Sequence, residues 1–226
     1  MHQANIILAS KDDFEAQAAH FIVSAIHRAT QNHGHCTLGL SGGSTPMPVY
    51  RLIREEKKVD WAKLMIFLVD ERFVTPDDPR SNQRMIRQTL LADHPLSEEQ
   101  IFLPDTSLPL YDCVAAYNRA VRELRPSLVV LGMGDDGHIA SLFPPLPPSA
   151  HGPSAVIHTT TGRFDVHDRI SVTLPVLQSA EKRLFLLSGE AKYALLQTMV
   201  SAPKDIDRFP AHALLDENTT WIVRTS

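Results

Sequence analysis

The chain has 226 residues, 43% of them hydrophobic, and a formal net charge of −4, so its length and apolar content suffice for the core of one α/β domain. This charge gives no general attraction to nucleic acid or to anionic membranes, because both need a basic surface. The sequence has no run of about 18 apolar residues, so we expect no membrane-spanning helix. We therefore predict one domain over residues 1–226, without a nucleic-acid or membrane partner.

The predicted elements alternate between helices and strands. Phe14, Ala18, Phe21, Ile22 and Ala25 recur at the spacing of one helix face. Apolar runs without polar alternation predict strands that are covered on both faces. In chain order we expect a helix over 12–31, a strand over 37–40, a helix over 46–56, a strand over 64–69, helices over 81–91 and 112–124, strands over 128–131, 155–160, 170–173 and 183–187, a helix over 190–200 and a strand over 220–223.

This alternation predicts the fold class. Parallel strands need long crossovers, which the helices between them supply, so we expect an α/β fold. Its architecture would be a single-domain three-layer α/β/α arrangement with a mostly parallel, Rossmann-like twisted sheet. The turns at Gly42 and Gly134 both follow strands, and we expect them to open on the same edge of the sheet, where α/β proteins bind ligands.

The turn over residues 41–45, Ser-Gly-Gly-Ser-Thr, predicts an anion site. Its flexible backbone N–H groups, its hydroxyls and the helix that follows it together suit a phosphate group. It lacks the lysine of a P-loop, which disfavours a nucleoside triphosphate and leaves a phosphate monoester. The alternative is an ordinary turn in which Ser or Thr caps the helix.

The turn over residues 132–138, Gly-Met-Gly-Asp-Asp-Gly-His, places Asp136 and His138 side by side after a buried strand. A histidine there can exchange protons near neutral pH, although a lone histidine can equally be structural. The glycines match the pattern of a dinucleotide site, but no acidic residue follows at about 20 residues and the two aspartates would repel a pyrophosphate. No histidine or cysteine spacing suggests zinc, so we predict no metal and no cofactor.

Two further features of the sequence indicate the cellular compartment of the protein. The first ten residues have neither a basic segment nor the long apolar stretch of a secretory signal. The two cysteines, Cys36 and Cys113, provide no disulfide framework. We expect a cytoplasmic protein, either a monomer or a small homo-oligomer.

Five blocks, taken in order, resemble the 6-phosphogluconolactonases, whose superfamily also contains the glucosamine-6-phosphate deaminases. They are LSGGSTP at 40–46, DERFV at 70–74 with Ser81, Asn82 and Met85, GMGDDGHIASLFP at 132–144, RISVTLP at 169–175 and GEAK at 189–192. The resemblance implies the enzymatic hydrolysis of a small-molecule substrate, 6-phospho-D-glucono-1,5-lactone, to 6-phospho-D-gluconate in the oxidative pentose phosphate pathway.

The resemblance also implies roles for individual residues. His138 would be the general base, Asp136 and Asp70 would orient the imidazole and the sugar hydroxyls, and Arg72 or backbone N–H groups would stabilise the oxyanion. The predicted phosphate-binding set consists of Gly42, Gly43, Ser44, Thr45, Arg169 and Lys192.

Two other functions remain open. A deaminase or isomerase continues the catalytic block with Phe-Asn-Glu, whereas this chain has Ser141, Leu142 and Phe143, and a phenylalanine cannot transfer protons. Ile139 is the residue commoner in deaminases, but an aliphatic side chain there is expected to be packed. A non-catalytic sugar-phosphate sensor would lack the Asp-His pair or carry a DNA-binding segment, and this chain has the pair and no such segment.

Overall fold

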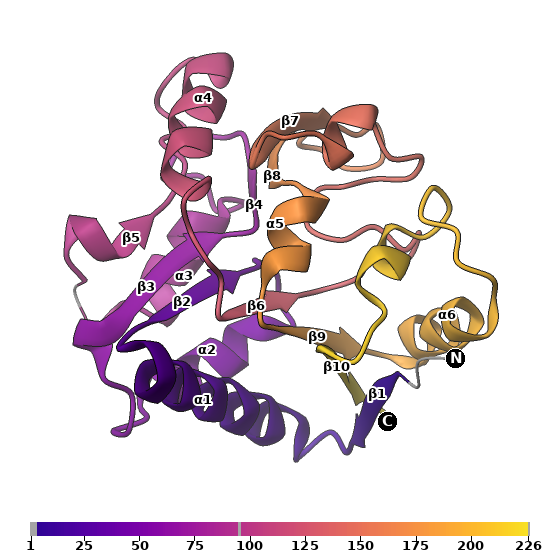
Figure 1. Ribbon diagram of the computed structural model, residues 1–226, viewed down its shortest axis with the longest axis horizontal. Coiled ribbons are helices and arrows are strands. Elements are labelled where there is room, and N and C mark those ends of the chain that lie inside the picture. The colour runs from indigo at the N-terminus through magenta and orange to yellow at the C-terminus, as the bar shows by residue number, and fades with distance from the viewer. Residues whose placement is uncertain (1–3, 95, 226) are drawn as a thin grey trace.

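The computed structural model describes residues 4–94 and 96–225. Its main sheet has seven parallel strands in the order β1-β10-β9-β6-β2-β3-β5 (Figure 1). These strands are β1 (Asn5–Ala9), β2 (Cys36–Leu40), β3 (Leu64–Leu68), β5 (Ile101–Phe102), β6 (Leu128–Leu131), β9 (Lys182–Ser188) and β10 (Thr219–Arg224). The predicted mostly parallel α/β sheet is confirmed.

Helices cover both faces of this sheet. They are α1 (Phe14–His33), α2 (Pro46–Arg54), α3 (Asn82–Thr89), α4 (Leu110–Val121), α5 (Leu174–Ser179) and α6 (Glu190–Ser201), with short 3₁₀ helices at Trp61–Lys63, Glu98–Gln100, Pro148–His151 and Pro210–Leu214. The five long helices expected from the sequence are present, with ends shifted by at most three residues. Strands β1 and β5, helix α5 and the three-residue strand at Asp70–Arg72 were not expected.

The central strands are apolar throughout because each face packs into its own core. In β6, Leu128 and Val130 belong to the core under α1, α2 and α3. Val129 and Leu131 point the other way, into the core shared with α4, α5 and α6. Successive residues of a strand face opposite sides, so a strand between two cores needs a continuous apolar run.

A second, three-stranded antiparallel sheet lies over one face of the main sheet (Figure 1). Its order is β4-β8-β7, with β4 at Asp70–Arg72, β8 at Asp168–Val172 and β7 at Val156–Thr160. The strands predicted over 155–160 and 170–173 are present as β7 and β8, but they form an antiparallel pair outside the parallel sheet. Residues 161–167 are too few for the crossover of a parallel pair, so the chain turns back as a hairpin.

The order of the strands creates a crevice beside β2. The chain passes from β2 to β3 and β5 on one side, then returns to β6 on the other side of β2. Ligands of open α/β sheets bind at such a reversal, outside the carboxyl ends of the strands. The turns after β2 and β6 meet here, which confirms that they open on one edge.

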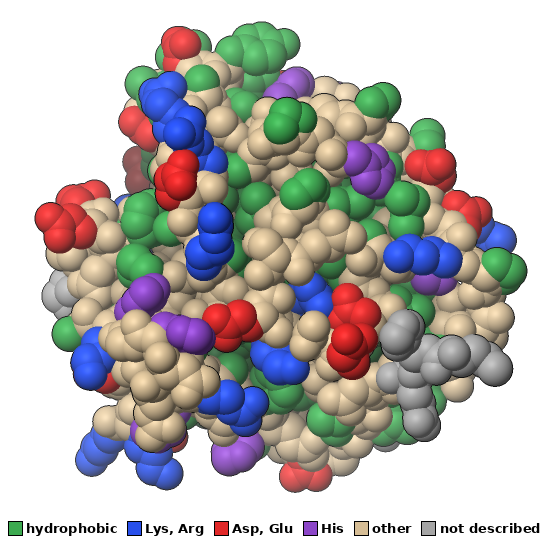
Figure 2. Space-filling model, in the orientation of Figure 1, with side chains coloured by type: hydrophobic (Ala, Val, Ile, Leu, Met, Phe, Trp, Pro, Cys, Tyr) green, Lys and Arg blue, Asp and Glu red, His purple; other side chains and the backbone are tan. Residues whose placement is uncertain are grey.

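Within the described residues, no helix is long and apolar enough to cross a membrane. On the face shown in Figure 2, Lys and Arg side chains lie in separate small groups among acidic and polar side chains. This face therefore shows no broad basic surface. An anionic ligand would have to be bound by a few cations placed together in a pocket.

Candidate active site

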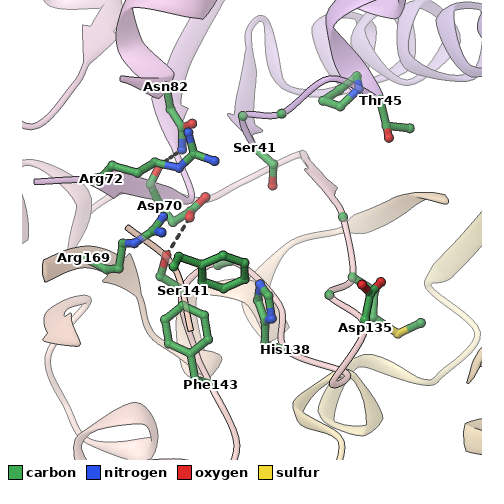
Figure 3. Close-up of a pocket in the computed structure, with 18 of the residues that line it drawn as sticks. Ser41, Thr45, Asp70, Arg72, Asn82, Asp135, His138, Ser141, Phe143 and Arg169 are labelled. Atoms are coloured by element: carbon green, nitrogen blue, oxygen red, sulfur yellow. Dashed lines mark hydrogen bonds between the residues drawn. The ribbon is translucent and has the colours of Figure 1, made fainter. Parts of the chain in front are cut away.

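A pocket of about 410 Å³ opens at the carboxyl ends of β2, β3 and β6 (Figure 3). Its volume lies within the usual range of small-molecule sites. Every site residue predicted from the sequence lines it: Gly42, Gly43, Ser44, Thr45, Asp70, Arg72, Asp136, His138, Arg169 and Lys192. Residues separated by up to 150 positions in the sequence are therefore brought to one cavity.

The loop after β2 is shaped by two glycines. A Cβ on Gly42 would lie 1.9 Å from Oδ1 of Asn82, so only glycine fits under that amide. Gly43 has a φ of +110°, a conformation that side chains disfavour. Helix α2 begins directly after Thr45, so its positive dipole end adjoins the pocket. This arrangement suits an anion.

Ser41 is a polar group of this loop that sequence reasoning left outside the predicted set. It is 7% exposed, and its Oγ has no hydrogen-bond partner within the described part of the protein. In Figure 3 the hydroxyl points into the pocket. A buried hydroxyl without a partner is costly, so a ligand that bonds to it would relieve that cost.

The turn after β6 is built around the imidazole. The N–H of Gly134 donates to the carbonyl of His138 at 2.9 Å, and Gly137 adopts a φ of +79°. A Cβ on Gly134 would lie 2.1 Å from Nδ1 of His138. The glycine pattern that resembled a dinucleotide site therefore makes room for a histidine ring.

His138 and Asp136 form a hydrogen-bonded pair. Nδ1 of His138 donates to Oδ1 of Asp136 at 2.6 Å, and the backbone N–H of His138 donates to the same oxygen at 3.1 Å. An ionised carboxylate only accepts hydrogen bonds, so the proton sits on Nδ1 and Nε2 keeps its lone pair. The imidazole is thus held in the tautomer of a base.

Asp136 also pairs with Arg163, whose Nη1 lies 2.5 Å from Oδ2. Burial alone would raise the pKa of Asp136, but its hydrogen bonds and charge attraction to His138, followed by the charge of Arg163, hold this pKa well below its usual range. The carboxylate is therefore ionised at any pH at which the folded protein would be assayed.

Two aromatic rings border the imidazole. The ring centroids of His138 and Phe143 are 4.7 Å apart, and those of His138 and Phe164 are 5.8 Å apart. The guanidinium of Arg169 lies 5.5 Å from the Phe164 ring centroid. The two rings cover part of the imidazole. Phe164 also contacts Arg169, so it lies between His138 and one of the cations of the pocket.

Three cations line the pocket without a carboxylate partner among the described residues. Arg72 donates to the carbonyl of Arg80 at 2.6 Å, Arg169 to that of Val166 at 3.0 Å, and Lys192 to that of Met133 at 2.7 Å. Burial, and then the nearby charge of Arg72, lower the pKa of Arg169. Cations held by carbonyls keep their charge available for an anion.

Asp70 faces the pocket but is not bonded to the imidazole. Its Oδ2 accepts a hydrogen bond from the hydroxyl of Ser141 at 2.7 Å, and its backbone carbonyl accepts one from the amide of Asn82 at 2.9 Å (Figure 3). The acid that holds His138 is Asp136. Asp70 instead joins the small sheet to residues 132–144 after β6, a segment that we call the catalytic turn after the role proposed below.

Several lining residues were missed from the sequence. They are Ser41, Asn82, Asp135, Ser141, Phe143, Arg163 and Phe164. Five of them, Ser41, Asn82, Asp135, Ser141 and Phe143, stand inside the sequence blocks and could have been included. Arg163 and Phe164 lie in the hairpin loop over residues 161–167, and no motif marks them. Among the described residues, no group of three or more His, Cys, Asp or Glu is placed to hold a metal ion, and the predicted absence of a metal stays a prediction.

Known proteins resemble this chain over nearly its whole length. The family described as glucosamine-6-phosphate isomerases/6-phosphogluconolactonase matches residues 9–222. A probable 6-phosphogluconolactonase of Dictyostelium discoideum is 36% identical over 96% of this chain and 95% of its own length.

Solved structures agree with this similarity. A 6-phosphogluconolactonase from Plasmodium vivax has a TM-score of 0.90 at 30% identity, covering 99% of this chain and 91% of the other. One from Thermotoga maritima has a TM-score of 0.88 at 27% identity, covering 99% and 100%. The chain therefore belongs to the glucosamine-6-phosphate isomerase/6-phosphogluconolactonase family.

Proposed function

We propose that this protein is an enzyme that hydrolyses 6-phospho-D-glucono-1,5-lactone to 6-phospho-D-gluconate in the oxidative pentose phosphate pathway. The observation that carries the proposal is one pocket of about 410 Å³ that is lined by the His138–Asp136 pair, by the glycine-serine loop and by cations that include Arg72, Arg169 and Lys192. A sugar phosphate with a reactive carbonyl at its other end needs these groups in one cavity. The relatives named 6-phosphogluconolactonase support the same substrate.

In the proposed reaction, His138 serves both halves of the hydrolysis. Nε2 takes a proton from water as the water oxygen bonds to the lactone C1, and the imidazolium then gives that proton to the ring oxygen as its bond to C1 breaks. One water is consumed, and the new carboxylic acid ionises. Positioned proton transfer of this kind contributes about 10²- to 10⁴-fold.

Other side chains would support this chemistry. Asp136 keeps the imidazole in the required tautomer, and Asp70 accepts hydrogen bonds from sugar hydroxyls. Arg72 or backbone N–H groups stabilise the oxyanion that forms at C1. No metal or cofactor takes part in this scheme.

The phosphate would bind at the loop formed by Gly42, Gly43, Ser44 and Thr45, with Arg169 and Lys192 supplying positive charge. Binding energy from this remote group fixes the lactone carbon against His138. We also propose that the protein is a single domain that acts in the cytoplasm. It would be a monomer or a small homo-oligomer and would have no nucleic-acid partner.

One contact favours hydrolysis over deamination. Phe143 occupies the position at which the deaminase pattern has a glutamate, and its ring lies 4.7 Å from that of His138. No proton can be passed through this ring. Ile139, the residue commoner in deaminases, is fully buried and takes no part in the pocket surface.

The proposal is tested with freshly generated 6-phosphogluconolactone. We expect 6-phosphogluconate to form faster than by spontaneous opening, and the excess rate to scale with protein concentration. Glucosamine 6-phosphate serves as the comparison substrate, with ammonia release as the readout. Ammonia release together with no acceleration of lactone opening would make the protein a deaminase.

A further inference from the structure

The loop over residues 161–167 reaches from the small sheet to the catalytic turn. It joins β7 to β8, and its Arg163 contacts Oδ2 of Asp136 at 2.5 Å. The next residue, Phe164, packs against His138 and Arg169. The loop thus contacts both members of the Asp136–His138 pair, although nothing in the sequence blocks marks it.

The two oxygens of Asp136 have different partners. Oδ1 accepts the N–H and the Nδ1–H of His138, while Oδ2 accepts Arg163. The terminal torsion of an aspartate is soft, so a carboxylate held at one oxygen can turn about its axis. A guanidinium on the second oxygen fixes the plane in which the first oxygen meets the imidazole.

We propose that Arg163 is a positioning residue of the hydrolysis, which acts on His138 through Asp136. The inference rests on the proposed function, in which His138 is the base. Arg163 keeps the carboxylate aimed at Nδ1, and its charge offsets that of the carboxylate beside the ring. Both effects keep Nε2 ready to accept a proton from water.

The charges around His138 show in which direction the positive charge of Arg163 shifts the protonation of the imidazole. The carboxylates that face the pocket are Asp135 and Asp136 from the catalytic turn and Asp70 from β4; the cations are Arg72 from β4, Arg163 from the hairpin loop, Arg169 from β8 and Lys192 from α6. Four cations oppose three carboxylates. Removal of the charge of Arg163 leaves three of each, which favours the protonated imidazole. A protonated His138 cannot accept a proton from water, so activity at acid pH should fall.

The test compares Arg163→Gln, Arg163→Lys and Asp165→Asn. Asp165 lies in the same loop and does not line the pocket, so it controls for a charge change nearby. We expect the acid limb of the kcat/KM profile of R163Q to move up by about half a pH unit, the scale of one charge several ångströms away in a largely aqueous setting. At pH 7.5 kcat should fall three- to tenfold with KM within twofold of wild type, because the carboxylate is less well aimed.

Arg163→Lys keeps the charge, so its acid limb should stay within about 0.2 pH unit of wild type. Asp165→Asn should leave the profile unchanged. If R163Q instead raises KM with kcat unaltered, Arg163 binds substrate directly and the proposal fails. An acid limb that stays in place or moves down in R163Q also overturns it.

A second measurement does not depend on the reaction. The pH midpoint of the His138 imidazole is followed by NMR in the substrate-free protein, and we expect it to rise in R163Q by the same half unit. If His138→Gln keeps full activity, His138 is not the base and the proposed mechanism fails, yet the NMR titration still decides whether Arg163 acts on the ring. An unchanged midpoint in R163Q would refute the coupling.

Discussion

Arg72 and Arg169 are directly paired in the antiparallel ladder between β4 and β8, and both line the pocket. Like charges opposite each other in such a pair are destabilising. Their side chains donate to backbone carbonyls, which neutralises neither charge. An anionic ligand beside them would relieve the repulsion, so this pairing is understandable as part of a binding site.

The first prediction concerns the phosphate anchor. Arg169→Gln should raise KM for the phosphorylated lactone at least tenfold, with kcat within threefold, because a charged hydrogen bond contributes about 1.5–3 kcal/mol and acts on binding. Hydrolysis of the unphosphorylated lactone should change far less. Arg125→Gln, at an exposed position outside the pocket, is the control.

Thermal unfolding gives an independent reading of the same anchor. Inorganic phosphate should raise the Tm of the wild type and of Arg125→Gln, and raise that of Arg169→Gln much less, since a ligand stabilises only the state that binds it. Equal shifts in all three proteins would place the phosphate elsewhere.

The second prediction concerns the base. His138→Gln should lower kcat by about 10²-fold or more with KM nearly unchanged, because the substitution removes proton transfer and leaves the phosphate site intact. His151→Gln, an exposed histidine outside the pocket, should behave as wild type. Near-normal turnover of H138Q would remove His138 from the mechanism.

The third prediction uses two glycines of one turn. Gly134→Ala should reduce kcat by about 10²-fold, since a 1 Å displacement of a catalytic group can cost that much and the new Cβ would lie 2.1 Å from Nδ1 of His138. Gly132→Ala is the matched control, because its Cβ would meet nothing within 4 Å. Equal activity of the two variants would contradict the argument that Gly134 makes room for the ring.

The fourth prediction concerns Glu71, which supports the pocket from behind. Its carboxylate is fully buried and accepts hydrogen bonds from the backbone N–H groups of Arg72, Asn82 and Gln83 and from the Ser81 hydroxyl. Burial raises the pKa of Glu71 from 4.5 to about 7, although these N–H groups lower it in part.

The folded chain thus keeps a proton on Glu71 that the unfolded chain loses near pH 4.5. The stability that this proton contributes is fully present below pH 4.5 and is lost as pH rises to about 7. Over that window the free energy of unfolding of the wild type should fall by about 3 kcal/mol relative to Glu71→Gln. Urea unfolding at pH 4.5, 6 and 8 measures the difference, and parallel curves for the two proteins would disprove it.

The parts of the fold that the sequence predicted are those with strong local patterns. A hydrophobic pattern indicates which side of a helix or strand is buried. The apolar run at Leu128–Leu131 and the helix face beginning at Phe14 are patterns of this kind. Strand β4 escaped prediction because Asp70–Arg72 is short and charged. Its partner β8 lies about 100 residues away, and no local signal records such a pairing.

The same contrast holds for the candidate site. His138 and the glycine-serine loop follow predicted strands, so a parallel sheet places them on one edge. Arg163 reaches Asp136 only because the hairpin loop folds back over the catalytic turn, which depends on tertiary packing. Ser41 was within reach of sequence reasoning, but its importance rests on an unbonded Oγ that only coordinates reveal.

The bond from Nζ of Lys192 to the carbonyl of Met133 has a consequence for biosynthesis. It joins the turn after β6 to helix α6, whose Lys192 is synthesised 59 residues after Met133. During synthesis, the glycine-serine loop and His138 leave the ribosome before α6 does. At that stage the nascent chain lacks the hydrogen bond from Lys192 to Met133. Lys192, one of the cations that line the pocket, can therefore take its place only after most of the polypeptide has been made.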